Sequence, residues 1–357
     1  MTLLLFLAGL ALLILGADLM VRGASRLSLS LGIAPLVVGL TVVSFGTSAP
    51  ELAISVKSAL DGQADLALGN VVGSNIFNVL FILGLSALVA PLVVDRQLIG
   101  QDVPILIGLS LLVGWMALDR DISRGDGLVL VLLLVAYTGL LYWSGRRAAP
   151  AAVEDPLVVG AESPWLSKLW VQLLLIVVGL ALLVLGSRWL VTAAIEMATA
   201  FGVSPLVIGL TIVSAGTSLP EVATSVVAAA RGEREIAVGN VIGSNIFNLA
   251  AVLGISALIP ADGLSVAPAL LAFDLPVMIA VAIACVPVLF TGHLIARWEG
   301  ALFLAYYIFY VTYLVLFAQD HDALDSYSLV MTTVVIPLTV VTMAVVAWRE
   351  LRPRRPA

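Results

Sequence analysis

Residues 35–51 read PLVVGLTVVSFGTSAPE, and residues 205–221 read PLVIGLTIVSAGTSLPE. The likeness continues without a gap to residues 88 and 258, and 33 of the 54 aligned positions are identical. A second shared stretch is GNVVGSNIFN at 69–78 and GNVIGSNIFN at 239–248. The chain therefore contains an internal repeat with an offset of 170 residues, and such self-similarity constrains the fold more than any single motif.

The composition places this repeat in a membrane. Of the 357 residues, 61% are hydrophobic and 11% are charged, whereas a soluble domain carries roughly 25% charged residues. Disorder is excluded because it requires low hydrophobicity and high charge. The net charge of −6 is small and scattered, so nothing indicates a nucleic-acid partner. We expect an all-α polytopic protein embedded in the lipid bilayer.

The apolar runs predict eleven spanning helices, because one span needs about 20 mostly apolar residues. The first run is not a signal peptide, since no basic segment precedes it and its GLALLILG recurs as GLALLVLG at 179–186. The expected helices are 2–21, 35–59, 66–91, 103–118, 127–143, 169–190, 205–230, 236–259, 268–290, 296–317 and 328–348. The expected units are a five-helix repeat at 1–145, a cytoplasmic linker at 146–168, a second five-helix repeat at 169–317, and an outer acidic loop, eleventh helix and basic tail at 318–357.

The helix count also predicts the orientation of the repeats. Five helices, an odd number, separate the two copies, so the second copy should cross the membrane in the opposite direction. Inverted repeats are typical of secondary transporters, whose sites lie near the midplane at the repeat interface. An N-terminus outside the cell places thirteen of the seventeen Lys and Arg residues on the cytoplasmic side, where they are usually enriched. We therefore expect a cytoplasmic C-terminus.

Glu51 and Glu221 occupy matching positions within the apolar spans of the two copies. A charged residue at the bilayer centre costs at least ~2.5–3.5 kcal/mol, and intramembrane carboxylates usually mark functional sites. Neither glutamate has a basic residue beside it in the spans with which it could pair. The sequence therefore predicts that a bound cation supplies the opposite charge.

A proline precedes each glutamate, and it removes the helical hydrogen bond to the carbonyl four residues earlier. This predicts helix breaks at Pro50 and Pro220. Free carbonyls at membrane depth are tolerated where they line a cavity or bind a ligand. The carbonyls expected to be freed are those of Gly46 and Gly216, and those beside them of Ser44 and Ser214.

Hydroxyl and amide side chains complete an oxygen-rich set. Helical spacing places on one face the residues Thr41, Ser44, Ser48, Glu51 and Ser55, and in the second copy Thr211, Ser214, Ser218, Glu221 and Ser225. Thr47 and Thr217 lie at the breaks, while the partner helices carry Ser74, Asn78, Ser244 and Asn248. Single hydroxyls often bond back to the preceding turn, and we assign that role to Thr41, Ser55, Thr211 and Ser225.

The remaining oxygens suit a hard cation. Calcium takes six to eight oxygen ligands, whereas magnesium keeps its waters, and no Cys or His cluster suits a transition metal. Calcium, or sodium of nearly equal size, is the expected ion.

Two further expectations are structural. Asp102 and Asp274, each two residues before a proline, should be helix N-caps. Close helix approach should be allowed by Gly69, Gly73, Gly239 and Gly243.

The paired GTSAPE/GTSLPE and GSNIFN/GSNIFN motifs resemble the α-repeats of the calcium/cation antiporter superfamily, in particular its prokaryotic sodium/calcium exchangers. The resemblance covers the ten helices from about residue 2 to 317. It implies a prokaryotic inner-membrane protein that exchanges cytoplasmic calcium for sodium by alternating access, with these ions as substrates and no cofactor. It also implies that Glu51 and Glu221 bind both ions and that Thr47 and Thr217 line the calcium site. Sodium-ligand roles are implied for Ser48, Ser74, Ser218, Ser244 and the carbonyls of Ser44 and Ser214, with Asn78 and Asn248 flanking the centre.

The chain departs from that family pattern in two respects. Some members, including potassium-dependent ones, carry Asp where Asn248 stands here, which argues against potassium coupling. The eleventh helix exceeds the ten-helix pattern.

Two alternatives to sodium/calcium exchange remain open. Protons can neutralise buried carboxylates as sodium does, so a proton-coupled antiporter for calcium or another divalent cation fits the same residues. An intramembrane enzyme could use paired carboxylates for acid–base or metal chemistry. The duplication of every ligand argues against an enzyme, because a catalytic site seldom needs two-fold copies of its residues. In addition, no nucleophile or leaving-group binder accompanies the pair.

Overall fold

The computed structural model describes the chain except for residues 149–167, 202–207, 209–211, 213, 291–292 and 352–357, and it is almost entirely helical. The first half contains α1 (Thr2–Leu31), α2 (Pro35–Val38), α3 (Ser44–Thr47), α4 (Ala49–Leu60), α5 (Ala64–Phe77), α6 (Gly84–Val89), α7 (Val103–Met116) and α8 (Arg124–Ala148). The second half contains α9 (Leu169–Ala200), α11 (Ser214–Gly216), α12 (Leu219–Ala230), α13 (Arg234–Phe247), α14 (Gly254–Leu258), α15 (Leu275–Phe290), α16 (Arg297–Ala318), α17 (Leu324–Val330) and α18 (Ile336–Leu351).

Short π-helical turns join several of these helices into longer ones. Two of them, Asn78–Leu83 and Asn248–Leu253, follow α5 and α13 at matching positions of the repeat. Further π-helical turns of the described residues include Gly39–Val43, Leu98–Asp102, Leu270–Asp274 and Met331–Val335, and a 3₁₀ turn covers Ala117–Asp119.

Nine of the described helices are long and apolar enough to span a bilayer. A tenth span is bent, because the axes of Pro35–Thr47 and Ala49–Leu60 differ by 45°. The expected span 205–230 ends in α12, but most of its first residues lie outside the described part of the chain. The protein is an all-α polytopic membrane protein, as the sequence predicts.

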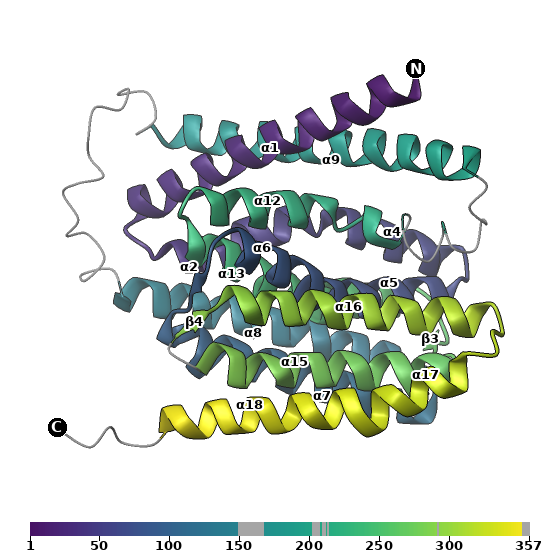
Figure 1. Cartoon of the computed structure of the whole chain (residues 1–357). Helices are drawn as coiled ribbons and strands as arrows, with labels where there is room; N and C mark the ends of the chain where they lie inside the picture. Colours follow the sequence, from purple (N-terminus) through teal and green to yellow (C-terminus); the bar gives the residue numbers. More distant parts are fainter. Residues whose placement is uncertain (149–167, 202–207, 209–211, 213, 291–292, 352–357) are drawn as a thin grey trace.

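Helices α1 and α9 lie side by side along one face of the molecule (Figure 1). With 30 and 32 residues they extend beyond the predicted 2–21 and 169–190, because the helices continue past the end of each apolar run. At 1.5 Å per residue, α1 is about 45 Å long. A Cβ added at Gly16 would lie 2.7 Å from the Gly179 carbonyl oxygen, and one at Gly179 equally close to that of Gly16. Glycine is therefore required where the two helices cross.

The expected close approach at the second shared motif is confirmed for one copy. A Cβ at Gly239 would lie 2.8 Å from the Leu36 carbonyl oxygen, and one at Gly243 would lie 2.7 Å from Leu40. Outside their chain neighbours and the adjacent backbone of their own helix, no atom of the described residues lies within 4 Å of a Cβ built at Gly69 or Gly73. The residues that match Leu36 and Leu40 in the second copy, 206 and 210, fall outside the described chain.

The described residues include four two-residue strands, which form two antiparallel pairs and which the sequence did not predict. β1 (Leu92–Val93) pairs with β4 (Leu294–Ile295), and β2 (Asp121–Ile122) pairs with β3 (Leu264–Ser265). Two residues are too few to show the alternating pattern by which a strand is recognised. Each pair joins a segment of the first half to a segment of the second.

The eleventh helix consists of α17, the π-helical turn Met331–Val335 and α18, and it lies at the edge of the molecule opposite α1 and α9 (Figure 1). Its contacts include the Tyr306 hydroxyl, which donates to Thr339 Oγ1 at 2.6 Å, and the Tyr327 hydroxyl, which donates to the Phe309 carbonyl at 2.8 Å. Helix α1 begins at one end of the bundle and α18 ends at the other (Figure 1), as an odd number of spans requires. Which end faces the cytoplasm stays a prediction.

The core lies where the two copies of the repeat meet. In α13 every residue from Ile236 to Phe247 is buried, and most of α5 is buried as well. A membrane helix that is buried all round must be surrounded by other helices. The two GSNIFN stretches therefore lie at the centre of the protein.

Candidate ion-binding site

The two predicted helix breaks occur beside the glutamates. Helix α3 ends at Thr47 and α4 begins at Ala49, so Ser48 separates them with φ −83° and ψ 5°. Ser218 precedes α12 with φ −88° and ψ 9°. Pro50 and Pro220 lie in the first turns of the new helices, as do the glutamates. Each break therefore creates a helix N-terminus, which stabilises negative charge, next to a buried carboxylate.

The two glutamates are 1% exposed each, and each is held by the opposite copy of the repeat. The Ser48 hydroxyl donates to Glu221 Oε1 at 2.9 Å, and the Ser218 hydroxyl donates to Glu51 Oε1 at 2.8 Å. Ser218 Oγ also lies 3.4 Å from Ser74 Oγ. The structure thus brings three of the predicted serines, Ser48, Ser74 and Ser218, together with both glutamates in one polar centre.

Several buried oxygens of the two glutamates and of the duplicated GSNIFN stretches accept no hydrogen bond from any described residue. They come from matching positions of the two copies, and they are Glu51 Oε2, Glu221 Oε2, Asn78 Oδ1, Asn248 Oδ1 and, from the second copy, Ser244 Oγ. Thr217 Oγ1 is likewise buried, close to Glu51. Buried polar atoms in native proteins are nearly always partnered. A group of unpartnered oxygens that includes two carboxylates is the donor set that a hard cation requires.

Two of the four carbonyls predicted to be free, those of Ser44 and Gly216, accept hydrogen bonds. The Ser44 carbonyl accepts the Ser48 N–H at 3.0 Å and the Thr47 hydroxyl at 3.4 Å. The Gly216 carbonyl accepts the Ser187 hydroxyl of α9 at 2.8 Å. The prediction is wrong for these two groups because a one-residue break keeps the neighbouring turn, and an adjacent helix replaces the bond that Pro220 removes. The Ser214 side chain and all of Thr211 lie outside the described structure.

The assignment of back-bonding hydroxyls is partly confirmed. Thr41 donates to the Val37 carbonyl at 2.6 Å, as expected. Ser55 Oγ and Ser225 Oγ instead accept the side-chain amides of Asn70 and Asn240, both at 2.9 Å. The prediction failed there because the neighbouring helices α5 and α13 bring an amide donor within reach.

Sequence reasoning missed Asn70 and Asn240 as part of the site. Asn70 Nδ2 also donates to the Glu51 carbonyl at 3.2 Å, and Asn240 Oδ1 accepts the Thr47 hydroxyl at 3.1 Å. Both asparagines stand at the second position of the duplicated GNV stretch. Their identity in the two copies is the signal that could have identified them.

Asn75 and Asn245, in the same duplicated stretch, were also missed. Each of the two donates its side-chain amide to the backbone carbonyl of the other. Asn245 also accepts a hydrogen bond from Asn78, and Asn75 accepts one from Asn248. The two asparagines are 3% and 2% exposed. The π-helical turns that follow this amide cluster pack against α12 and α4, the helices that carry Glu221 and Glu51.

The prediction that Asp102 and Asp274 are helix N-caps is wrong. Each lies inside a continuous helix, because a π-helical turn joins it to α7 or α15. The Tyr137 hydroxyl donates to Asp102 Oδ1 at 3.0 Å, and the Tyr310 hydroxyl donates to Asp274 Oδ1 at 2.8 Å. The carboxyl groups therefore link neighbouring helices rather than capping their own.

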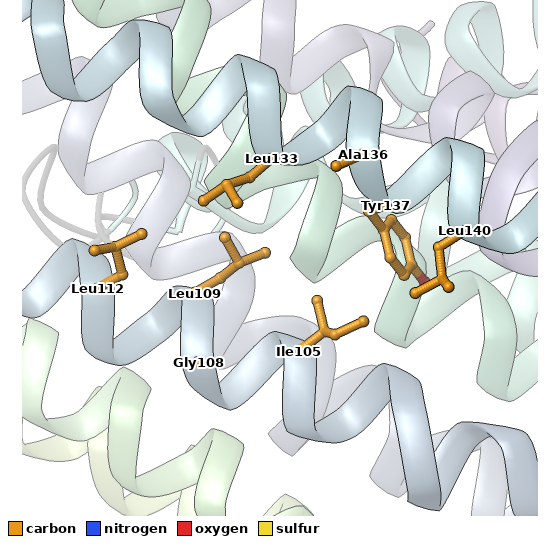
Figure 2. Close-up of a pocket in the computed structure, with 8 residues that line it drawn as sticks. All are labelled: Ile105, Gly108, Leu109, Leu112, Leu133, Ala136, Tyr137 and Leu140. Carbon is orange, nitrogen blue, oxygen red and sulfur yellow. The ribbon is translucent and has the colours of Figure 1, made fainter.

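A separate cavity of about 550 Å³ lies between α7 and α8 (Figure 2). Its lining is apolar apart from the Tyr137 hydroxyl, and the lining side chains include Ile105, Leu109, Leu112, Leu133 and Leu140. Such a lining offers no oxygen ligand set for a cation. The cavity is therefore distinct from the centre around Glu51 and Glu221.

Comparison with known proteins shows relatives along nearly the whole chain. The inner membrane protein YrbG of Escherichia coli is 39% identical over 259 residues, covering 71% of this chain and 79% of YrbG. The sodium/calcium exchanger MaX1 of Methanosarcina acetivorans is 33% identical over 343 residues, covering 87% and 97% of the two chains. The solved structure of the sodium-calcium exchanger NCX_Mj, soaked with 2.5 mM Na⁺ and 0.1 mM Ca²⁺, superposes with a TM-score of 0.73 at 31% identity, covering 87% of this chain and 97% of that one.

The family described as "Sodium/calcium exchanger protein" matches residues 1–143 and 171–316. These two ranges contain both copies of the repeat and every residue of the polar centre, and they leave out the linker and the eleventh helix. The chain belongs to the sodium/calcium exchanger family of cation antiporters.

Proposed function

We propose that this protein exchanges calcium for sodium across the membrane at the polar centre formed by Glu51 and Glu221. The observation that carries the proposal is the pair of buried glutamates, each bonded through one oxygen to a serine of the opposite repeat, with the other oxygen unpartnered among the described residues. The family membership supports cation exchange, and the similar proteins MaX1 and NCX_Mj are named as sodium/calcium exchangers.

The charge of the centre explains why exchange is coupled. One calcium ion carries two positive charges and can neutralise both carboxylates, and so can sodium ions that together supply the same charge. With neither ion bound, two charges would cross a low-dielectric region without a partner, which is strongly unfavourable. The protein would therefore change its access side mainly when loaded, and this produces exchange rather than leak.

Access to the site would alternate by movement of one group of helices against the rest. Inverted-repeat transporters operate in this way around a roughly fixed site. The inverted orientation, an outer N-terminus and a cytoplasmic C-terminus belong to this proposal. A centre made by residues of both repeats is suited to such a movement, because the same ligands can be reached from either side.

Transport measurements test which ion drives exchange. Purified protein is placed in sodium-loaded proteoliposomes, and calcium uptake is compared with uptake into sodium-free vesicles that hold an acid interior. We expect uptake with the sodium gradient alone. Uptake driven only by the proton gradient would establish the proton-coupled alternative and remove the sodium roles of the serines. If neither gradient drives calcium uptake, calcium is not the substrate.

The glutamate assignment has its own test. Glu51→Gln and Glu221→Gln should each abolish exchange, because the amide keeps the size of the side chain but removes one of the two charges that hold the ions. Both variants should still fold, as judged by gel filtration in detergent. Glu196→Gln is the matched control, since Glu196 is exposed on α9 and, among the described residues, accepts the Thr2 hydroxyl. Retained exchange in either buried variant would contradict the proposal.

A further inference from the structure

We propose that Asn75 and Asn245 are positioning residues that fix the amide orientation of Asn248 and Asn78, so that each of these presents its oxygen to the transported cation. The inference rests on the proposed function, because it assigns the source of ligand orientation at the same centre. Steric packing does not distinguish the two orientations of an asparagine amide, since its oxygen and its NH₂ group are nearly the same size. Only hydrogen bonds decide which of the two faces the ion.

The backbone carbonyl groups of Asn75 and Asn245 fix the orientation of the first pair of side-chain amides. Asn75 Nδ2 donates to the Asn245 carbonyl oxygen at 3.3 Å, and Asn245 Nδ2 donates to the Asn75 carbonyl oxygen at 3.4 Å. A carbonyl oxygen can only accept a hydrogen bond. The NH₂ group of each side chain must therefore face the opposite backbone, and its Oδ1 must face the other way.

The second step passes this orientation to the next pair of asparagines. Asn245 Oδ1 accepts from Asn78 Nδ2 at 2.9 Å, and Asn75 Oδ1 accepts from Asn248 Nδ2 at 3.2 Å. Because an amide oxygen can only accept, Asn78 and Asn248 must direct their NH₂ groups toward these partners. Their own Oδ1 atoms are left on the other side, where both are buried and accept no hydrogen bond from the described chain.

The consequence for a cation follows from the charge distribution of the amide. An oxygen carries partial negative charge and coordinates calcium or sodium, whereas an NH₂ group carries partial positive charge and repels both. Asn78 and Asn248 begin the π-helical turns that pack against α12 and α4, the helices that carry Glu221 and Glu51, so a flipped amide would replace a ligand with a repulsive group. In each case the orienting residue belongs to the opposite copy: Asn245 orients Asn78, and Asn75 orients Asn248.

A purely structural role for the same asparagines makes a different prediction. If Asn75 and Asn245 only hold α5 and α13 together, replacing either one should cost the same whatever stands at position 78 or 248. If they orient amides, the cost should depend on whether the residue that they orient has two different ends. Aspartate has an oxygen at both ends, so it needs no orientation.

The experiment is a pair of double-mutant cycles on the full chain purified in detergent, with calcium binding measured by radioactive ⁴⁵Ca²⁺. Asn245→Leu should weaken calcium binding about 10- to 100-fold, the usual effect of losing a group that orients a metal ligand. In reconstituted vesicles the KM for calcium should rise more than the maximal rate falls. In the Asn78→Asp background the same substitution should cost less than threefold. In the Asn248→Asp background it should keep its full effect, since Asn245 does not orient residue 248.

The second cycle reverses the pairing: Asn75→Leu should be rescued by Asn248→Asp and not by Asn78→Asp. Alanine replaces leucine in either cycle if the leucine variant does not elute as a single species in gel filtration. Equal losses in all three backgrounds would overturn the inference and leave a structural role. If the wild-type protein binds calcium and Asn245→Leu binds it with the same affinity, the inference is overturned while the proposed function stands. Wild-type protein that binds no calcium would overturn both.

Discussion

At the scale of single residues, the two oxygens of each buried glutamate have different environments. Oε1 of Glu51 accepts the Ser218 hydroxyl, and Oε2 has no hydrogen-bond partner in the described part of the chain. Glu221 and Ser48 repeat this arrangement. The serine holds one carboxylate oxygen in place and leaves the other available to a ligand, and a group held in one position loses less freedom when an ion binds.

Removing either serine hydroxyl should therefore weaken ion binding. Ser48→Ala and Ser218→Ala each leave a buried carboxylate oxygen without its donor, and a hydrogen bond to a charged group contributes about 1.5–3 kcal/mol. We expect the sodium concentration that gives half-maximal exchange to rise at least severalfold in each variant. Ser110→Ala is the control, because the Ser110 hydroxyl of α7 only bonds to the Leu106 carbonyl of its own helix. Unchanged sodium dependence in both site variants would contradict this role.

The two tyrosine–aspartate pairs lead to a prediction about stability. Asp102 Oδ1 accepts the Tyr137 hydroxyl, and Asp102 Oδ2 has no partner among the described residues. Tyr137→Phe removes the donor from a buried carboxyl group, which costs about 1–3 kcal/mol of unfolding free energy. Thermal unfolding in detergent should show a lower Tm for Tyr137→Phe and for Tyr310→Phe. Tyr313→Phe should change little, since Tyr313 stacks on Phe273 with a ring-centroid distance of 4.0 Å and phenylalanine keeps that stacking.

At the scale of helices, the sequence predicts most of the fold because membrane helices are defined by simple physical requirements. Apolar runs locate ten spans among the described residues, and Pro50 predicts the bend before α4. The helix ends of α1 and α9 were misplaced because a helix continues through polar residues once it leaves the hydrocarbon. The π-helical turns and the two-residue strands were missed because they carry no periodic pattern long enough to detect.

The site was predicted to the extent that its residues are costly in a membrane. Glu51 and Glu221 are identified by their charge alone, and their duplication points to the serines and asparagines near them. Asn70, Asn75 and their counterparts were missed because an amide can be a ligand, a helix link or an orienting group, and sequence does not say which. The carbonyl of Gly216 was misassigned because its partner Ser187 lies on a helix that sequence cannot place beside it.

The crossing of α1 and α9 leads to a prediction about glycine. Gly16→Ala and Gly179→Ala would each place a Cβ 2.7 Å from a backbone oxygen of the other helix, so we expect the helices to separate and the Tm in detergent to fall. Gly139→Ala on α8 is the matched control, because no described atom outside its chain neighbours and adjacent helix backbone lies within 4 Å of its Cβ. It should raise the Tm slightly, since alanine favours a helix by up to about 1 kcal/mol over glycine. A rise in Tm for all three variants would show that the crossing tolerates a methyl group.

At the scale of the whole molecule, the pair β2–β3 joins the two halves within a group of acidic residues. Asp121 pairs with Ser265 across the strands. Partial burial raises the pKa of Asp121 above its usual value, and the nearby carboxylates of Asp119, Asp126 and Asp262 raise it further. An aspartate with a raised pKa in the folded protein destabilises the fold once it is charged. The cost develops as the pH rises from the unfolded pKa to the folded pKa, and it persists above that range.

Asp121→Asn should therefore raise the Tm at pH 7 in low salt. The gain should shrink as the pH is lowered through the range in which Asp121 takes up a proton, because the wild-type side chain is then neutral as well. It should also shrink in 1 M salt, where charges more than about 3 Å apart are screened. A lower Tm for the variant at pH 7 in low salt would contradict the sign of this effect.

The bonds between the two copies also determine the order in which the protein can be completed during synthesis. Ser218 follows Glu51 in the chain by 167 residues, Asn245 follows Asn75 by 170, and β4 follows β1 by some 200. When the first five helices have left the ribosome, their polar groups have no partners from the second copy, and unpaired polar groups in lipid are costly. The nascent first half is thus an unfinished intermediate, and the last stages of translation both close the strand pairs and assemble the polar centre.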